Sequence, residues 1–501
     1  MNIERILRIG DVSDNGQVTI VDEDRLCYLV KSVSKGAVGL RTISKPLLKE
    51  FVAFMKQHPD IPANEVRFKI SGQSKIDKYE YGYGATISVM ANMVLRRMPM
   101  HHEEISPRSH EIRTSEIAFE SLYRPYITAI KSKPFLLLAG ISGTGKSRIV
   151  RELARACWEE GSEEYKAQKP KNFEMIQVKP NWHDSSELIG YVSRVSGKAE
   201  FVAGDFLKFI AKAWENEDIP HFLCLDEMNL APVEQYFAEY LSVIESRKNK
   251  DGKVVTDAIV EKCAEQWYFD LTSQLTEDDD LRKKFNEEGI SIPQNLIVIG
   301  TVNMDETTFS FSRKVLDRAM TIEMNEVDLE AGLDNRYERI GKLGAAELIG
   351  NAVEGVDVYA DNQEVCKTVI GYLKAVNDKL EGTPFKVAYR TRNEFLLYVV
   401  NNLPYTKNEN GEELSQEVII ARALDEITNM KILSRIEGDT EKIGNILEDL
   451  SGTIKEQLGV ISSGKEYSGT KGKEGTEYSV SLAKLKEMKL RLRSGYTSFW
   501  N

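Results

Sequence analysis

The sequence lacks the long apolar runs that mark membrane-spanning proteins. None of its apolar stretches reaches the roughly 18 residues that a transmembrane helix needs. Residues 1–5 also lack the apolar core of a secretion signal. The sequence therefore predicts a cytoplasmic protein with no membrane partner.

Cysteine is scarce, and its usual pairings are missing. The chain has five scattered cysteines with no C-x-x-C motif: Cys27, Cys157, Cys224, Cys263 and Cys366. Because zinc sites and disulfide frameworks use closely spaced cysteines, we expect reduced thiols and no zinc site. His101, His102 and His110 lie in a charged segment without a further ligand at a helical spacing. We interpret that segment, residues 99–113, as a solvated linker between domains.

Positive charge is not in excess either. The chain has 66 lysines and arginines against 78 aspartates and glutamates, a formal net charge of -12. This balance argues against a protein coated with basic residues for nucleic-acid binding, although one local basic surface is compatible with it. The composition, 42% hydrophobic and 29% charged, is that of a globular protein, and the length suggests about two to four domains.

One stretch carries a strong signal for nucleotide binding. Residues 135–139 are an apolar run of strand length, residues 140–147 read G-x-x-x-x-G-K-S, and a helical pattern follows at once. This is a P-loop in its usual context, in which backbone N–H groups cradle phosphates, the lysine faces the β- and γ-phosphates, and the serine ligates Mg²⁺. The expected phosphate-binding residues are Gly140, Gly143, Thr144, Gly145, Lys146 and Ser147, and Ser147 is also an expected Mg²⁺ ligand.

A second strand pattern ends in two adjacent carboxylates. Residues 220–225 are mainly apolar and are followed by Asp226 and Glu227. After a P-loop this is a Walker B pattern, in which Asp226 holds Mg²⁺ through water and Glu227 orients and polarises the attacking water. A third apolar strand pattern, residues 295–302, ends in Asn303. We expect the Asn303 side chain to reach the γ-phosphate and that water.

Two arginines follow the third strand pattern. Arg313 and Arg318 lie in a predicted helix that leads into a short strand at residues 320–324. Both are candidate arginine fingers, and Arg318 is the one we place in the mechanism. Such a residue reaches the nucleotide of a neighbouring subunit and stabilises the charge of the transition state. The active site would then be complete only in an oligomer.

The remaining segments predict three further parts around this core, which we place at residues 116–325. Residues 1–115 read as a small α+β domain for possible DNA or target recognition, with strands at 17–21 and 26–30 and helices at 47–58 and 85–98. Its segment 67–84 interleaves cations, tyrosines and glycines, and predicts either a solvated hairpin or a DNA contact. Within the core, residues 248–289 read as an insertion in which 266–271 form a strand or an apolar anchor, and residues 231–246 read as one helix.

The C-terminal part predicts an α-helical lid at residues 326–460. Helical patterns occur at 365–380, after residue 385, at 417–433 and at 440–458. Residues 461–501 read as a flexible linker and a basic helix, whose cations alternate with apolar residues over 482–493. That helix either contacts DNA phosphates or a partner, or packs on the lid.

Together these motifs resemble the AAA+ class and, within it, the McrB-like NTPases, the motor subunits of McrBC-type modification-dependent restriction systems. The resemblance covers about residues 116–450. It rests on the P-loop, on Leu-Asp-Glu-Met-Asn at 225–229, on Gly-Thr-Val-Asn-Met-Asp-Glu at 300–306 with Leu-Asp-Arg at 316–318, and on the Pro-Asn-Trp-His-Asp loop at 180–184. Two departures, Leu230 in place of an arginine and Met304-Asp305-Glu306 in place of T-x-D, leave ATP against GTP open.

The resemblance implies an α/β fold: an AAA+ P-loop core with a parallel sheet between helices, an α-helical lid and a small α+β N-terminal domain. It implies that Asn303 is a sensor-1 residue and that Arg390, or as second choice Arg392, touches the phosphates as sensor 2. It implies Mg²⁺ as cofactor, ATP or GTP as substrate, and self-association into a ring, a hexamer.

The first functional hypothesis is the motor subunit of a restriction or phage-defence system that moves on or remodels duplex DNA. A separate McrC-like nuclease would cut, because the sequence has no P-D…D/E-x-K nuclease motif after a strand pattern. The alternative is a MoxR-type AAA+ chaperone that remodels a protein client. A third hypothesis, a DNA-binding module that uses nucleotide only to assemble, fits less well because the residues for hydrolysis are present.

Overall fold

The computed structural model describes residues 123–304, 309–325, 340–408, 412–464 and 479–500, together with three strands and a few helical residues of the N-terminal part. The chain separates into two compact units, Met1–Arg113 and Thr114–Asn501. Each unit is described by itself.

The N-terminal unit contains a three-stranded antiparallel sheet, β1-β2-β3. β1 (Val18–Glu23) and β2 (Cys27–Ser34) confirm the two predicted strands, and β3 (Ala37–Ser44) is a third strand that the sequence did not indicate. Segments 67–84 and 99–113 lie outside the described residues. Five buried helical residues lie within the two predicted helices: Leu48, Val52, Met90, Ala91 and Met93.

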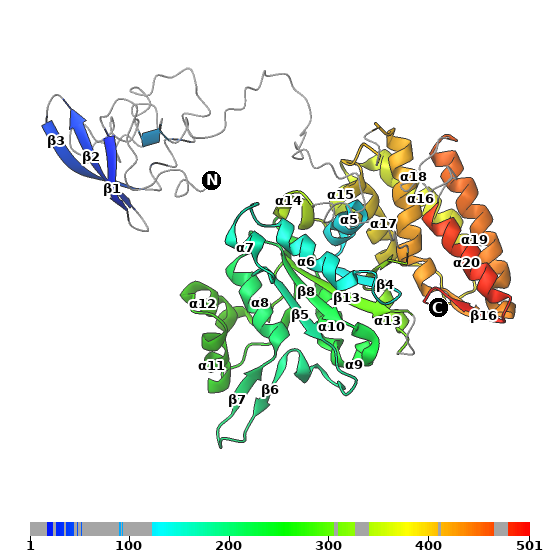
Figure 1. Cartoon of the computed structure of the whole chain (residues 1–501), viewed down its shortest axis with the longest axis horizontal. Helices are drawn as coiled ribbons and strands as arrows, with labels where there is room; N and C mark the ends of the chain where they lie inside the picture. The colour runs from blue at the N-terminus through cyan, green and yellow to red at the C-terminus, as the bar shows by residue number, and fades with distance from the viewer. Residues whose placement is uncertain are drawn as a thin grey trace. The chain divides into compact units, whose positions relative to one another are not determined.

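The second unit is built on a five-stranded parallel sheet in the order β14-β4-β13-β8-β5. Figure 1 labels β4, β13, β8 and β5 of this sheet. Parallel strands between helices are buried on both faces and therefore need no alternation of polar and apolar residues, which explains the continuous apolar runs in the sequence. The predicted α/β class, with a parallel sheet between helices, is confirmed. The strands are β4 (Phe135–Gly140), β5 (Phe173–Gln177), β8 (His221–Asp226), β13 (Leu296–Asn303) and β14 (Met320–Glu323).

Helices cover both faces of this sheet and form two separate cores. Leu136 and Leu138 of β4 belong to a core shared with α6 (Lys146–Ala156) and the C-terminal helices. Leu137 belongs to the opposite core, shared with α8 (Asp205–Glu215). Since successive side chains of a strand point to opposite faces, β4, β8 and β13 contribute to both cores.

In the segment between β8 and β13, one expectation is wrong and one of two alternatives is excluded. The single helix predicted over residues 231–246 is interrupted at Phe237, whose backbone is not helical, between α9 (Val233–Tyr236) and α10 (Ala238–Val243). Residues 266–271 form the first part of helix α11 (Gln266–Leu275) and not a strand, and they confirm the other alternative, an apolar anchor, because Tyr268 and Leu271 lie in the core. The buried side chains of that segment, Tyr268 and Leu271, follow a helical spacing that the local run of aromatic residues conceals.

Other elements frame this core. A hairpin of β6 (Gly190–Ser193) and β7 (Glu200–Ala203) precedes α8. The segment before β13 also contains β9 (Lys248–Lys250), β10 (Lys253–Val255), β11 (Ala258–Val260), α12 (Asp279–Glu288) and β12 (Ile290–Ser291). After β13 comes the short helix α13 (Arg313–Leu316).

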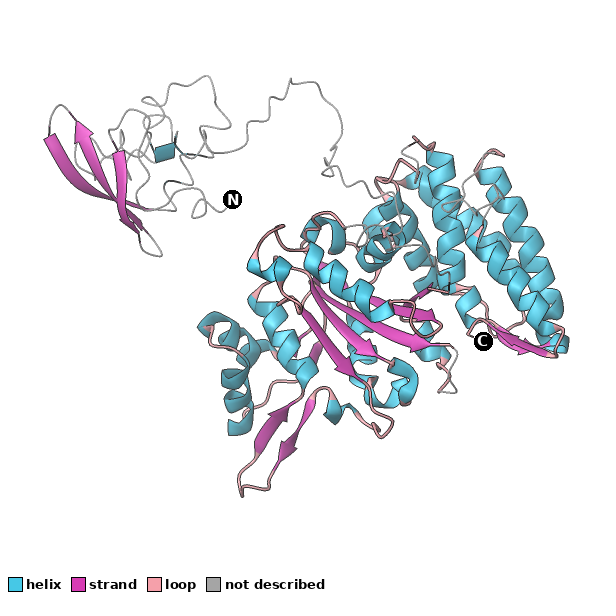
Figure 2. Ribbon diagram, viewed as in Figure 1, coloured by secondary structure: helices cyan, strands magenta, loops and turns pink. Residues whose placement is uncertain are grey.

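The C-terminal part forms a helical domain on the β14 side of the sheet (Figure 2). Its helices confirm the predicted helical patterns, including the basic one at the end of the chain. None of the helices in the described ranges combines the length and the apolar character needed to cross a membrane. The elements are α14 (Ala345–Leu348), α15 (Val356–Tyr359), α16 (Gln363–Asp378), α17 (Tyr389–Asn402), α18 (Gln416–Lys431), β15 (Glu437–Asp439), α19 (Thr440–Ile461), α20 (Val480–Leu492) and β16 (Tyr496–Ser498).

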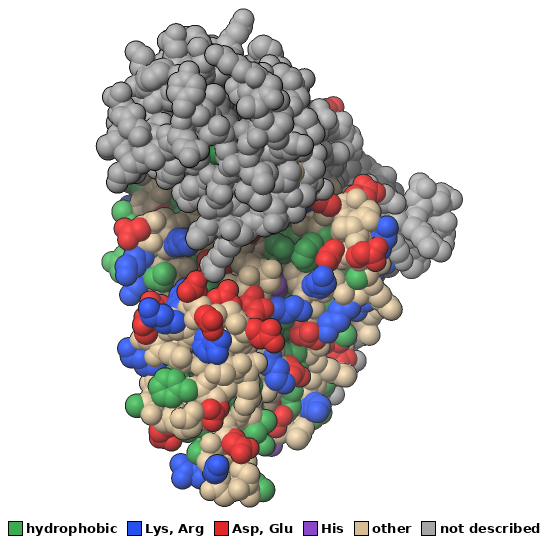
Figure 3. Space-filling view, turned by 90° about the vertical axis from the view of Figure 1, so that its left-hand side faces the viewer, with side chains coloured by type: hydrophobic (Ala, Val, Ile, Leu, Met, Phe, Trp, Pro, Cys, Tyr) green, Lys and Arg blue, Asp and Glu red, His purple; other side chains and the backbone are tan. Residues whose placement is uncertain are grey.

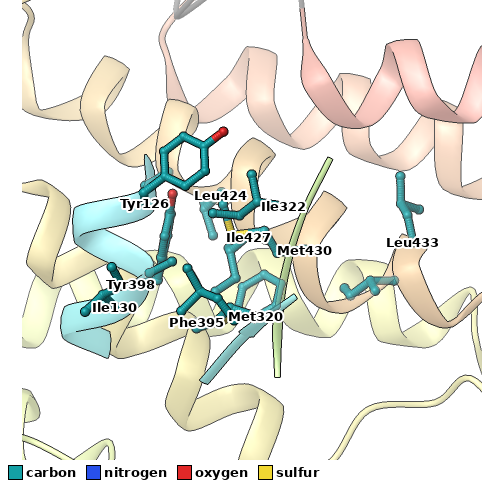
Figure 4. Packing of buried hydrophobic residues seen from close by; sticks show 14 of the residues in the cluster. Tyr126, Ile130, Met320, Ile322, Phe395, Tyr398, Leu424, Ile427, Met430 and Leu433 are labelled. Carbon is teal, nitrogen blue, oxygen red and sulfur yellow. The ribbon is translucent and has the colours of Figure 1, made fainter. Parts of the chain in front are cut away.

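The helix that precedes the P-loop strand joins this helical domain. Figure 4 shows Tyr126 and Ile130 of α5 (Arg124–Ser132) beside Phe395 and Tyr398 of α17, with Met320 of β14 close by. Buried apolar residues of the sheet and of the helical domain therefore form one continuous core.

Buried ion pairs join the same parts. Lys133, which lies just before β4, pairs with Glu394 of α17, and the other carboxylate oxygen of Glu394 lies 2.8 Å from Lys431 of α18. Lys431 is fully buried and also donates to the carbonyl oxygens of Asp317 (3.0 Å) and Ala319 (2.8 Å). Burial alone would raise the pKa of Glu394, but the two lysines outweigh burial and hold that pKa below its usual range. The cluster thus depends on an ionised Glu394.

Replacing Glu394 should destabilise the second unit strongly. Glu394→Gln leaves Lys133 and Lys431 buried without a carboxylate, and we expect a loss of about 3 kcal/mol in the free energy of unfolding, the size typical of breaking a buried ion pair. Urea unfolding followed by tryptophan fluorescence measures this loss. Glu448→Gln, which removes an exposed partner of Lys489, is the control and should change stability little. Equal effects of the two substitutions would contradict a supporting role for the buried cluster.

Candidate nucleotide-binding site

The P-loop joins β4 to α6. Gly143 and Gly145 have backbone φ angles of 85° and 84°, a left-handed conformation that glycine adopts without steric cost. Gly145 is also the N-cap of α6, so the N–H groups of the loop and of the first helical turn gather at one place, which is an anion-binding arrangement. The structure therefore brings the predicted phosphate-binding residues of the loop together.

Lys146 lies back across this loop. Its Nζ donates to the carbonyl oxygens of Gly140 (2.9 Å) and Ile141 (2.7 Å), and the residue is only 6% exposed. Thr144 Oγ1 donates to the same carbonyl of Ile141 at 3.1 Å. The ammonium group is thus held at the loop as a point charge, the role that a P-loop lysine plays toward phosphates.

Ser147 and Asp226 meet at the predicted metal position. Ser147 Oγ donates to Asp226 Oδ1 over 2.5 Å, although the two residues come from α6 and β8. Thr301 of β13 donates to the same carboxylate oxygen at 2.8 Å and accepts from the Glu227 N–H at 2.9 Å. Thr301 is a site residue that the sequence analysis missed. The sequence did offer an indication: Thr301 has a hydroxyl in an otherwise apolar strand. It lies two residues before Asn303, so the two side chains share one face of the sheet.

Glu227 and Asn303 also lie together. Asn303 Nδ2 donates to Glu227 Oε1 over 3.2 Å, so the carboxylate is oriented by the end of the neighbouring strand. Glu227 has a backbone φ of 54°, a left-handed conformation that is uncommon for a residue other than glycine. Such conformations persist only where the surroundings enforce them, and they concentrate at functional sites.

The Pro-Asn-Trp-His-Asp loop lies beside β8 and has a structural explanation. The N–H of Val178, which precedes the loop, donates to the Asp226 carbonyl at 3.1 Å. Trp182 is buried against the ring of Tyr236 at a centroid distance of 5.4 Å. Asp184 Oδ1 accepts from the Ser186 N–H at 2.8 Å and caps a short 3₁₀ turn.

Arg318 lies at the opposite edge of the sheet. It precedes β14, which runs parallel to β4, whereas the P-loop follows β4. The six residues of β4 separate these edges by roughly 20 Å at 3.3 Å per residue. Arg318 Nε lies 3.3 Å from Glu245 Oε1. Arg318 is therefore remote from the P-loop of its own chain, as an arginine that serves a neighbour must be.

Arg390 lies beside Arg318 and not at the P-loop of its own chain. Its guanidinium pairs with the other oxygen of Glu245, and Glu394, one turn later on α17, pairs with Lys133 directly before β4. This placement keeps Arg390 away from the phosphates of its own chain, so the expected phosphate contact would have to be made with a neighbouring subunit. Arg392, the second choice, lies on the same turn, over the ring of Tyr389 at 5.0 Å. The helix was predicted, but its docking against the amino edge of the sheet was not.

Arg313 lines a cleft of about 160 Å³ that opens beside Asn303. Its guanidinium lies over the ring of Phe385 at 4.8 Å. Across the cleft, Arg435 Nε lies 3.1 Å from Asp317 Oδ1. The structure thus places Arg313 against the helical domain of its own chain.

Comparison with known protein families agrees with this geometry. Residues 135–320 match the family model of the AAA domain, dynein-related subfamily, and residues 347–496 match a domain of unknown function, DUF8727. No curated protein matches the chain. The match spans β4 to the start of β14 and so contains the P-loop, the Asp-Glu pair and Asn303. The site at the carboxyl edge of the sheet therefore belongs to an AAA+ P-loop ATPase domain, which this chain carries ahead of its helical C-terminal domain.

Proposed function

We propose that the protein is an oligomeric NTPase whose active sites are completed between neighbouring subunits. One observation carries this proposal: the phosphate-binding residues and Arg318 lie at opposite edges of one sheet. A single chain cannot bring both to one nucleotide, whereas a ring of like subunits can. Arg390 shares Glu245 with Arg318, so we assign both arginines to the nucleotide of the neighbour.

Within one chain, the carboxyl edge of the sheet binds the nucleotide. The hydroxyl of Ser147 and the carboxylate of Asp226 suit Mg²⁺, which prefers oxygen ligands, and their oxygens lie 2.5 Å apart. Mg²⁺ bound there would neutralise charge on the β- and γ-phosphate oxygens. Lys146 and the loop N–H groups hold the same phosphates.

Glu227 and Asn303 place the attacking water. The Asn303 amide orients the carboxylate of Glu227, which accepts a proton from the water as it attacks. Thr301 forms hydrogen bonds with the side chain of Asp226 and with the backbone of Glu227. It therefore fixes the position of the Glu227 backbone relative to the Asp226 carboxylate. Arg318 of the neighbour stabilises the charge that develops.

The resemblance to McrB-like NTPases supports a more specific role as a DNA-translocating or remodelling motor. In this role the ring, a hexamer in our proposal, works with a separate McrC-like nuclease on duplex DNA in a restriction or phage-defence system. Support for the role comes from the Asp-Glu-Met-Asn and Val-Asn-Met-Asp-Glu segments of the sequence.

The charges of the C-terminal helix favour the alternative, a MoxR-type chaperone with a protein client. Lys484, Lys489 and Arg491 of α20 pair with glutamates of the same chain, while Lys486 and Arg493 are exposed. The face of the molecule in Figure 3 likewise mixes Lys and Arg with Asp and Glu side chains over its described part. Both observations reduce the basic surface offered to DNA.

Substitutions at the site should separate binding from turnover. We expect Lys146→Ala to weaken nucleotide binding about ten-fold or more, because a charge-assisted contact worth roughly 1.5–3 kcal/mol is lost. Glu227→Gln should keep binding and lower turnover about 100-fold or more, the usual contribution of a general base. Titration with a fluorescent nucleotide and a phosphate-release assay measure the two effects. Full turnover by Glu227→Gln would refute its assigned role.

Mixing two inactive variants should restore activity if Arg318 acts on the neighbour. Arg318→Ala should lower turnover about a thousand-fold, as for other arginine fingers. In an equal mixture of Arg318→Ala and Glu227→Gln subunits, roughly one site in four has both an intact Glu227 and an intact arginine from its neighbour in a closed ring. Turnover should rise to about that fraction of the wild-type rate. Mixed oligomers that stay inactive would rule out Arg318, and the same test then applies to Arg313.

Hydrolysis of ATP and GTP, each with and without duplex DNA, decides between the two specific roles. Turnover that DNA stimulates, or that prefers GTP, is expected for the McrB-like motor. ATP-selective turnover that DNA leaves unchanged would favour the chaperone. Lys146→Ala is the control in every arm, because turnover that survives it comes from another protein.

A further inference from the structure

The end of β14 lies directly against the start of the P-loop. The Met324 N–H donates to the Ala139 carbonyl at 2.7 Å. A Cβ atom added to Gly140 would lie only 2.5 Å from the Met324 carbonyl oxygen, a distance that real side chains do not tolerate. Residues 323–325 therefore form one wall of the loop that binds the phosphates.

Asn325 connects this wall to the loop itself. Its Oδ1 accepts the N–H of Ile141, the second residue of the P-loop, at 3.0 Å, and its Nδ2 donates to Glu323 Oε1 at 2.5 Å. Its Nδ2 also lies 3.8 Å from the Met304 sulfur, and Met304 directly follows Asn303. The amide of Asn325 thus contacts the loop, the end of the sensor-1 strand and a carboxylate.

Glu323 forms an ion pair with Lys484, a buried lysine near the C-terminal end of the sequence. Lys484 of α20, whose side chain is 2% exposed, places Nζ 2.7 Å from Glu323 Oε1. The same Nζ lies 3.2 Å from Glu487 and 4.5 Å from the ring centre of Phe499. Asp425 of α18 fixes α20 in position, because it accepts from the Val480 N–H (2.8 Å) at the first turn of that helix.

We propose that Lys484, Glu323 and Asn325 form a relay by which the C-terminal helical domain positions the P-loop and raises its affinity for nucleotide. Lys484 is then a positioning residue, which acts through the other two. The relay rests on the proposed NTPase function, since it assumes that the P-loop binds a nucleotide.

Electrostatics explains why the relay favours nucleotide. Glu323 is a carboxylate 15% exposed at the edge where a polyphosphate would bind, and an uncompensated anion there would repel that ligand. Lys484 neutralises it, and with the carboxylate held in place Asn325 can keep its amide turned toward Ile141. The first turn of the loop is then fixed before the ligand arrives, which lowers the entropic cost of binding.

Three variants of the full-length protein test the relay. Lys484→Met should weaken binding of a fluorescent ATP or GTP analogue in the presence of Mg²⁺ about ten-fold, with KM rising in parallel and kcat changing less than about two-fold, because the charge left on Glu323 acts on binding. The double variant Lys484→Met with Glu323→Gln should return to within about two-fold of wild type, because no unpaired charge is left beside the phosphates and the glutamine oxygen can still accept from Asn325 Nδ2. Lys489→Met is the matched control, since it lies on the same helix with an exposed partner, Glu448, and should bind as wild type does.

The readouts separate the relay from a mere loss of stability and from failure of the proposed function. A purely structural defect lowers the active fraction, and hence kcat, without changing the affinity of the molecules that remain folded. The relay is wrong if Lys484→Met binds the nucleotide with wild-type affinity, or if the double variant binds it as weakly as Lys484→Met does. In either case the NTPase proposal still stands, provided that Lys146→Ala weakens binding. If Lys484→Met does not fold, Asn325→Ala gives the decision, and unchanged affinity there overturns the relay as well. If Lys146→Ala instead binds the nucleotide as tightly as the wild type does, the NTPase proposal itself is wrong.

Discussion

Parallel pairing of five strands in one register is the constraint on which the site depends. Asn303 pairs with Gly140, and Gln177 pairs with Asp226, so the ends of four strands arrive at one edge. Because parallel strands all point the same way, side chains that directly follow a strand lie on the phosphate side, and side chains that directly precede one, such as Arg318, lie at the other end of the sheet. The separation of Lys146 from Arg318 is a result of the same geometry.

The helical domain contacts both edges of this sheet. At the amino edge, α17 supplies Arg390 and Glu394, and at the carboxyl edge, α20 supplies Lys484. Between them, one apolar core runs from the sheet into the helices. This domain is therefore packed against the core along β14, and any movement on hydrolysis must shift contacts at both edges together.

Sequence alone predicted most of the sheet and the residues that meet at its carboxyl edge, because each motif there is local: an apolar run and the polar residues that follow it. Contacts between segments far apart in the sequence could not be predicted in this way. Arg390 pairs with Glu245, which lies 145 positions earlier, and nothing in either segment indicates the other. Thr301 was missed because one hydroxyl does not alter an apolar pattern. The strand alternative for residues 266–271 was wrong because aromatic residues, which favour strands, occur there in a helix.

Glu245 has a consequence for how subunits associate. One carboxylate serves two guanidinium groups, Arg318 and Arg390, so these three side chains together carry about one unit of positive charge. If a neighbour's nucleotide supplies the missing negative charge, the ligand and the subunit contact stabilise each other. Thermodynamic linkage then requires the converse: protein concentration sets the apparent affinity for nucleotide, and nucleotide sets the midpoint of assembly. Salt, which screens exposed charges, would loosen both together.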